Sequence, residues 1–250
     1  MAGSVKFKRD RKFLKSNWDV LEFDSSDQAK KIPVPPMEKP YTVQNGKVIR
    51  LLKPESWRNI GRISLKDAIM KRQSRRKYTN ETISFEELSF LLYATQGVKK
   101  NSGRHSFRTV PSGGARHPFE TYLFVWNVEG IEKGIYRYLP LEHAVCLEKK
   151  YVKGMEKELD SATMGQFWNA GFYFIWTAIP YRTEWRYIDA SAKLIAIDAG
   201  HLCQNLYLAC EEIGCGTCGI GSYSQKEADS FLCVDGKDEF CVYMAPVGKV

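Results

Sequence analysis

A short stretch at residues 71–78, KRQSRRKY, packs five cations into seven positions: Lys71, Arg72, Arg75, Arg76 and Lys77. Ser74 lies among them and adds a hydroxyl that can donate to a phosphate oxygen. Guanidinium groups bind phosphate and carboxylate through two parallel hydrogen bonds. The stretch therefore predicts an anion-binding site for a nucleic acid, a membrane surface or a single bound phosphate. A set of solvated surface charges is the remaining alternative.

Helical geometry narrows these alternatives. A helix that starts near Leu65 and turns about 100° per residue places Leu65, Ala68 and Ile69 on one buried face. Arg72 then falls near the centre of that face, as does Arg76 if the helical turn continues. Arginine is rarely buried alone, because removing its charge from water costs several kcal/mol. We therefore expect an anion at these two arginines, with a solvated helix end and an arginine–carboxylate pair as the alternative. The other cations are expected at the surface: Lys71, Arg75 and Lys77.

A second candidate is the loop RTVPSGGARHPFE at residues 108–120, which joins a predicted helix to a predicted strand. Gly113 and Gly114 permit backbone conformations and a close approach that other residues forbid. Pro111 and Pro118 stiffen the two sides of the loop. Such a loop can bring backbone N–H groups against an anion or a flat polar ring. An ordinary tight turn is the alternative.

Two familiar motifs are set aside on structural grounds. GCGTCG at 214–219 fits the dinucleotide-binding pattern, but a helix precedes it and a strand follows, which reverses the required order. Cys215 and Cys218 form a C-x-x-C pair without a second ligand pair for zinc, so we interpret them as buried thiols and expect no metal site. His201 follows Asp198 by one helical turn and is interpreted as a packed histidine, with a catalytic role as the alternative.

The elements that position these residues follow from periodicity and capping signals. Ser84 and Glu87 form a capping box for the clearest helix, and Gly97 is its natural stop. Helices are predicted at 64–72, 84–97, 189–213 and 224–232. Strands are predicted at 119–128, 171–180, 239–248, at the start of 216–223, and as a hairpin over 134–150 with Pro140 in its turn. The pattern predicts an α+β domain with helices packed on a mixed, mainly antiparallel sheet of four to five strands.

Residues 1–62 differ from the rest of the chain. KKIPVPPMEKP at 30–40 is rich in proline and is expected to be extended. We predict an irregular N-terminal extension over residues 1–62 that packs over the body or a partner subunit. Residues 63–250 are predicted to form one domain.

Composition and charge limit the class of protein. The chain is 44% hydrophobic, which is enough for a sizeable core, and residues 1–76 hold 19 of its 37 lysines and arginines but only 8 of its 29 acidic residues. This asymmetry favours an anionic partner, although basic and aromatic residues do not interleave as nucleic-acid binding requires. Neither a signal peptide nor a membrane span is evident, and the seven cysteines lack disulfide-scaffold spacing. We expect reduced thiols in a cytoplasmic protein that binds no membrane.

Six ordered segments together resemble the nitroreductase superfamily of flavoproteins, and within it the SagB-type dehydrogenases. The resemblance covers about residues 63–249. The segments are RQSRRKY (72–78), SFEELSFLLYATQGV (84–98), RTVPSGGARHPFETYL (108–123), GIYRYLPLEH (134–143), DAGHLCQNLYLACEEIGCGTCGIGSY (198–223) and APVGK (245–249).

The resemblance implies a nitroreductase-like α+β fold that forms an intertwined homodimer with FMN at the subunit interface. It assigns the FMN phosphate and ribityl chain to Arg72, Ser74 and Arg76, with Lys249 also reaching the phosphate. It assigns contacts with the flavin from the other subunit to Pro111, Ser112 and Gly113. It places beside the reactive part of the isoalloxazine ring Gly221 and Ser222, and it matches Gln166 to a flavin-contacting amide.

One position departs from the SagB-type pattern. Members that oxidise azolines in peptides carry a Lys–Tyr pair ahead of DAGH or EAGH, and the corresponding residues here are Arg186 and Tyr187. Arginine cannot act as a base as lysine can, whereas Tyr187 can serve as a general acid or base. The acidic residue that simple nitroreductases carry beside the flavin is Gly221 here.

The resemblance thus implies an FMN-dependent oxidoreductase that transfers hydride through flavin N5 and takes electrons from NAD(P)H, although no motif here recognises that donor. The substrate is expected to be a small molecule or a peptide. Two alternatives stay open: an azoline-type dehydrogenase acting on a modified peptide, and a flavin-binding protein without turnover. A nucleic-acid-binding module remains the alternative outside this class.

Overall fold

Seven strands form a central sheet, and a separate two-stranded sheet lies apart from it. This computed structural model describes residues 11–41 and 47–250. In sheet order, the central strands are β1 (Val48–Arg50), β6 (Ala144–Lys150), β5 (Gly134–Leu139), β4 (Phe119–Val125), β7 (Phe172–Ala178), β9 (Phe240–Lys249) and β8 (Cys215–Thr217). The two-stranded sheet pairs β2 (Val98–Asn101) with β3 (Ser106–Arg108).

Every pair of neighbouring strands in the central sheet is antiparallel, which confirms the α+β class with a mainly antiparallel sheet. The expected number of four to five strands is wrong. Among the central strands β1 was not predicted; it pairs with β6 although it lies in the segment expected to be irregular. Its three residues are too few to show the alternation that identifies a strand, so only the pairing with β6 reveals it. The strands β2 and β3 of the second sheet were not predicted either.

Helices lie on both faces of the sheet. They are α2 (Leu65–Lys71), α3 (Phe85–Gln96), α4 (Met155–Ala162), α5 (Tyr181–Tyr187), α6 (Ser191–Glu212) and α7 (Gln225–Leu232). Short 3₁₀ turns span Arg11–Leu14, Trp18–Val20, Phe23–Ser25, Pro54–Ser56, Gly113–Ala115 and Ile188–Ala190. Two of the helices, α4 and α5, were not predicted, because neither begins at a serine, threonine, aspartate or asparagine cap: their N-cap residues are Gly154 and Pro180.

Capping explains where the clearest helix begins. The Glu87 N–H donates to Ser84 Oγ over 3.2 Å and the Ser84 N–H donates to Glu87 Oε2 over 2.9 Å, so the predicted capping box is confirmed. The helix ends before Gly97, as expected. At the start of α7, by contrast, the Ser224 side chain makes no capping hydrogen bond.

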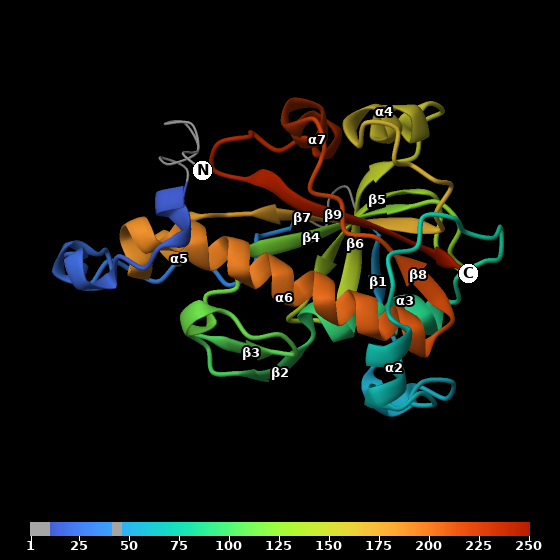
Figure 1. Ribbon diagram of the computed structural model, residues 1–250, viewed down its shortest axis with the longest axis horizontal. Helices are drawn as coiled ribbons and strands as arrows, with labels where there is room; N and C mark the ends of the chain where they lie inside the picture. The colour runs from blue at the N-terminus through green and yellow to red at the C-terminus, as the bar shows by residue number, and fades with distance from the viewer. Residues whose placement is uncertain (1–10, 42–46) are drawn as a thin grey trace, which may run out of the picture.

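Alternate residues of the central strands supply two separate cores. Phe172, Phe174 and Trp176 of β7 pack with residues of α3 and α6, whereas Tyr173 and Ile175 pack with residues of α4 and α7. All five are fully buried, as the two-residue period of a strand between two helical layers requires. Figure 1 shows the resulting layers, with α6 and α3 on one side of the sheet and α4 and α7 on the other.

The buried face predicted for the helix after Ser64 is wrong. Only Ala68 of α2 is buried, while Leu65, Ile69 and Met70 are 68%, 56% and 76% exposed. The helix has seven residues and contacts α6, so a narrow side is enough to cover its packing surface. Arg72 is therefore the residue at the end of a short helix rather than a member of a buried apolar stripe.

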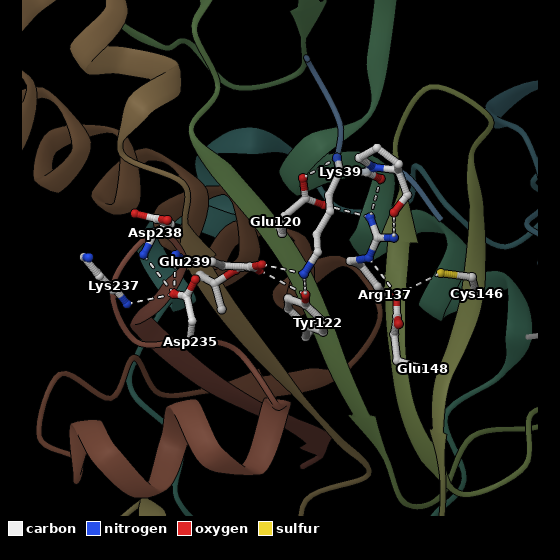
Figure 2. A network of polar contacts seen from close by, with 12 residues as sticks. Lys39, Glu120, Tyr122, Arg137, Cys146, Glu148, Asp235, Lys237, Asp238 and Glu239 are labelled. Atoms are coloured by element: carbon white, nitrogen blue, oxygen red, sulfur yellow. Dashed lines mark hydrogen bonds and ion pairs between the residues drawn. The ribbon is translucent and has the colours of Figure 1, made fainter. Parts of the chain in front are cut away.

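A buried ionic network ties the proline-rich segment to the sheet (Figure 2). Arg137 donates to the carbonyl oxygens of Lys39 and Pro40 over 2.9 and 3.1 Å and pairs with Glu120 over 3.2 Å. Lys39 Nζ lies 2.6 Å from the Glu239 carboxylate. Arg137 and Glu120 are almost completely buried, so loss of either partner leaves a charge that costs several kcal/mol. The division of the chain at residue 62 stays a prediction.

Most of the cysteine thiols are shielded from solvent. All seven cysteines are free thiols, and six are buried, including Cys215 and Cys218 of the C-x-x-C pair. Burial raises the pKa of the Cys215 thiol to about 12, which keeps it protonated and unreactive. Among the helices within residues 11–41 and 47–250, none has the length and apolar character needed to cross a bilayer.

Candidate cofactor and substrate site

The cationic segment leaves the helix and runs along the edge strand β8. The Arg72 N–H donates to Ala68 O over 3.0 Å and ends α2, and Ser74 then forms a parallel bridge with Thr217. The Arg75 N–H donates to the Thr217 carbonyl oxygen over 2.9 Å. Arg76 thus lies beyond the end of the helix, and the continued helical turn that would have aligned it with Arg72 is not formed.

Tyr207 of α6 holds this segment in place. Its hydroxyl lies 3.0 Å from Ser74 Oγ and accepts a 2.8 Å hydrogen bond from the Gly219 N–H, while the Arg72 guanidinium lies 5.4 Å from its ring centre. Burial raises the pKa of Tyr207, so the phenol keeps its proton. That proton can be donated to Ser74, which frees the Ser74 hydroxyl to donate to a ligand. Beyond its position in a predicted helix, nothing in the sequence marked Tyr207 as a site residue.

A strained loop brings two further segments to the same place. Gln166 Nε2 donates to the carbonyl oxygens of Ser222 and Thr163 over 2.9 and 2.7 Å, and the ring of Trp168 lies 5.9 Å from the Arg76 guanidinium. Three non-glycine residues of this loop have positive φ angles: Met164, Trp168 and Asn169. Such strain is often found at functional sites. Gly221, beside Ser222, is exposed and has open space at its α-carbon.

We call these residues the arginine cluster: Arg72, Ser74, Arg76, Gln166, Trp168, Tyr207, Gly221 and Ser222. Within the described ranges, Arg72 and Arg76 form no ion pair with a carboxylate, so the alternative of a paired helix end is not observed. Arg75 is half-buried, and its Nε atom is buried without a partner, which corrects the expectation of a solvated side chain. The segment therefore retains positive charge that an anion can neutralise.

Lys249 lies beside β8 in the sheet, but its side chain already has partners. Its ammonium group lies 2.5 Å from Glu87 Oε1 and donates to Ile213 O over 3.0 Å. Burial lowers the pKa of Lys249, but the hydrogen bond to Glu87 and neighbouring negative groups raise it overall. A lysine ammonium has three donors, so one donor remains after these two contacts.

The loop at 108–120, here called the glycine loop, is held by Asp198 of α6. Ser112 Oγ donates to Asp198 Oδ2 over 2.5 Å, the Gly113 N–H donates to Asp198 Oδ1 over 3.3 Å, and the His117 N–H donates to Ser112 Oγ over 2.9 Å. Burial raises the pKa of Asp198. His201 faces Asp198 as the one-turn spacing indicates, with Nδ1 3.9 Å from Asp198 Oδ1, but its side chain is 41% exposed and so only partly packed.

Tyr187 and Arg186 end α5 against the glycine loop. Tyr187 is buried, and its hydroxyl lies directly against Gly114. The Arg186 guanidinium lies 5.2 Å from the Tyr187 ring centre, and the Trp18 ring meets the same ring edge-on at 5.6 Å. Within the part of the chain that the structure covers, the Tyr187 hydroxyl makes no hydrogen bond, so a ligand can accept its proton.

The predicted site residues thus form two groups rather than one. Asp198 marks the glycine loop and Tyr207 marks the arginine cluster, and nine residues of one straight helix separate them by about 13 Å. Pro111, Ser112 and Gly113 belong to the first group, with Arg186 and Tyr187. In neither described range does the structure bring together three His, Cys, Asp or Glu side chains in a metal-binding arrangement.

Residues 69–249 match the model of the nitroreductase family. Among curated proteins, the nitroreductase-named protein MJ1384 of Methanocaldococcus jannaschii is 32% identical over 191 residues, which are 76% of this chain and 93% of that protein. The trifolitoxin-processing protein TfxB of Rhizobium leguminosarum bv. trifolii is 31% identical over 139 residues, which are 54% of this chain. The aligned part is only 37% of TfxB.

A solved structure supports the same fold. A nitroreductase-type protein of Ralstonia eutropha superposes with a TM-score of 0.67 at 22% identity and covers 85% of this chain and 93% of its own. At this identity the likeness concerns the fold. The family match spans most of the chain, from the arginine segment to the last strand, and MJ1384 is similar over nearly its full length. This chain therefore belongs to the nitroreductase family.

Proposed function

We propose that the chain is an FMN-dependent oxidoreductase of the SagB-type branch of this family. The observation that carries the proposal is the pair Arg72 and Arg76, which flank Ser74 in sequence and have no carboxylate partner in the described chain. Two guanidinium groups around a hydroxyl donor suit a phosphate group better than a carboxylate-rich or apolar ligand.

The residues of the arginine cluster fit FMN as its binding site. Arg72, Ser74 and Arg76 would hold the phosphate and ribityl chain, and the free donor of Lys249 would add one hydrogen bond. Gly221 offers open space for a flat ring, and Ser222 and Gln166 present polar groups beside it. FMN, when bound, supplies hydride transfer at its flavin ring, with NAD(P)H as the proposed electron donor.

The protein itself would supply binding, polarity and a proton. Backbone N–H groups near Gly221 and Ser222 can stabilise negative charge at a bound ring without reorganisation. Tyr187 can donate its phenolic proton to a substrate or take one from it. Arg186 stays protonated, so it acts through its charge and cannot replace a lysine base.

We propose a homodimer, which would account for the two separate groups of predicted residues. The arginine cluster and the glycine loop lie about 13 Å apart along α6, so one ligand is contacted more readily by the cluster of one subunit and the loop of another. Pro111, Ser112 and Gly113 would then meet the flavin held by the partner chain. The exposed apolar residues of α2 suit burial in such an interface: Leu65, Ile69 and Met70.

Cofactor identification tests the proposal directly. The purified protein is expected to be yellow or to take up FMN when FMN is added, and heat release should return FMN rather than FAD. Stopped-flow reduction by NADH and by NADPH then separates an enzyme from a flavin-binding protein without turnover. A colourless protein that takes up no added FMN contradicts the proposal.

A peptide-modifying activity is the second candidate. The similarity to TfxB favours it, because that protein is named for processing trifolitoxin. The residue at position 186 weighs against azoline oxidation, since arginine replaces the lysine of the Lys–Tyr pair. Oxidation of an azoline-containing peptide by the FMN-loaded protein would favour this candidate over turnover of small molecules.

A further inference from the structure

A cationic cavity of 650 Å³ opens beside the glycine loop. Its walls come from the β2–β3 hairpin, the glycine loop and the end of α5. Lys99, Arg108 and Arg186 line it together with the histidines His105 and His117. None of the lining residues that the structure describes is aspartate or glutamate, so the wall carries one sign of charge.

Neighbouring groups leave this positive charge in place. Arg108 is buried, yet it donates only to neutral acceptors, namely Gln96 Oε1 at 2.9 Å, Ser106 Oγ at 3.1 Å and Met37 O at 3.0 Å. Arg116, next to the cavity in sequence, donates to the Arg182 carbonyl oxygen over 2.7 Å. Across the described ranges, the guanidinium groups of Arg108 and Arg116 form no ion pair with a carboxylate, whereas that of Arg182 pairs with Glu120.

The positive charge of nearby arginines also affects the pKa values of the two histidines. Burial, together with the nearby charge of Arg108, lowers the pKa of His117 to about 3. Burial also lowers the pKa of His105, with added repulsion from Arg116 and Arg186. His105 Nδ1 is buried and has no hydrogen-bond partner, so one polar atom beside the cavity is unsatisfied.

Glu120 and Glu38 partly offset the charge of Arg108, but the nearby acids are held by other groups. Asp198 is engaged by Ser112 and Gly113 on the α6 side of the loop, and burial raises its pKa. Glu120 is buried between Arg137 and Arg182. A cavity with several unpaired cations and no acid is costly unless a ligand brings negative charge to it.

We propose that this cavity binds the carboxylate or phosphate of the small molecule that exchanges electrons with the cofactor. Lys99 and Arg186 hold the anionic group at the mouth, and Phe107, Val110 and Pro111 contact the apolar part of the molecule. The exchange of electrons rests on the proposed function, whereas the binding of an anion needs no cofactor. It assigns Arg186 to substrate recognition, which suits a residue that cannot act as a base.

Binding of two matched probes tests this assignment. Isothermal titration calorimetry on the full chain would compare 4-nitrobenzoate with nitrobenzene, which lacks the carboxylate. Lys99→Gln and Arg186→Gln should each weaken 4-nitrobenzoate about tenfold, the cost of one lost charge-assisted hydrogen bond, while Lys99→Gln leaves nitrobenzene unchanged. Lys150→Gln and Arg50→Gln remove exposed cations from other parts of the chain and serve as controls.

Two further arms identify the source of the anion. If the variants lose affinity for NADPH relative to NADH instead, the cavity binds the additional phosphate of the donor, which still supports the anion site. Equal loss for both nitro compounds, or no loss for any anion, overturns the proposal. Loss of FMN content in Lys99→Gln would also overturn it, because the cavity would then hold the cofactor. A wild-type chain that binds 4-nitrobenzoate but no FMN would contradict the proposed function alone.

Discussion

The hydroxyl of Tyr187 fills the space that a side chain at position 114 would need, so Tyr187 fits here only while residue 114 is glycine. Gly114 also has a φ of +57°, a backbone conformation that other residues adopt at a cost. Its neighbour Gly113 has neither restriction, since a methyl group there would stand 3.4 Å from Leu194. The glycine loop and the end of α5 are thus one coupled unit.

Gly114→Ala should lower the free energy of unfolding by about 1 to 3 kcal/mol, through strained backbone and overlap with the phenol. Tyr187→Phe removes the overlapping oxygen and should return part of this loss in the double variant, while the backbone strain remains. Chemical denaturation of the four proteins of this double-mutant cycle measures the coupling. Gly113→Ala should cost less than Gly114→Ala, and purely additive effects would contradict the contact.

Tyr187→Phe should lower kcat by about a hundredfold or more if the phenol transfers a proton in turnover. Steady-state kinetics with NAD(P)H and a nitroaromatic acceptor measures the change, and flavin absorbance shows whether FMN content is unaltered. Tyr181→Phe changes the same group at the other end of α5, where the hydroxyl donates to Asp27, and is the matched control. A Tyr187→Phe protein with wild-type kcat and pH profile would remove the assignment.

Arg72→Gln should weaken FMN binding by about ten- to a hundredfold, because a charge-assisted hydrogen bond contributes about 1.5 to 3 kcal/mol. Lys249→Gln should weaken it less, since Glu87 already neutralises that ammonium group. Fluorescence titration of FMN against each apoprotein gives the dissociation constants. Lys71→Gln, an exposed cation on the preceding turn, should bind FMN as wild type does. Equal affinities for all the variants would return the cationic segment to the role of a solvated surface.

Glu120 makes stability depend on acid pH. Burial alone would raise its pKa, but Arg182 and Arg137 outweigh burial and hold the pKa below its ordinary value of 4.5. A carboxyl with a lowered pKa in the folded state stabilises the protein fully above about pH 4.5 and loses this contribution as the pH falls below that value. Glu120→Gln should therefore destabilise the protein by about 3 to 5 kcal/mol at pH 7, and by progressively less toward pH 3.

Urea unfolding at a series of pH values checks this expectation. Glu158→Gln, which changes an exposed glutamate on α4, provides the control and should follow the wild type at each pH. A difference between Glu120→Gln and wild type that stays constant from pH 7 to about pH 3 would show that the ion pairs are not the cause.

Local signals predicted much of the fold. The capping box of Ser84 and Glu87, the apolar run of β7 and the turn at Pro140 lie in short stretches of chain, and the structure has all three. The burial of α2 and the pairing of β1 were not predicted, because both depend on which surface lies opposite. Leu65 is exposed although its spacing suits a buried face, and β1 is a strand only because β6 lies beside it.

The sequence by itself determined the types of group available for chemistry: two arginines around a serine, a loop with two glycines, and a tyrosine preceded by an arginine. These identities follow from local spacing, and together with family resemblance they indicated a flavin-type site. Tertiary structure alone decided the partners. Tyr207 joins Ser74 to Gly219, and Asp198 holds the glycine loop. Lys99, Arg108 and Arg186 line one cationic cavity. Each of these arrangements joins segments that are far apart in the chain. Such contacts form only when packing of the central sheet fixes the positions of α5 and α6, and local sequence carries no record of them.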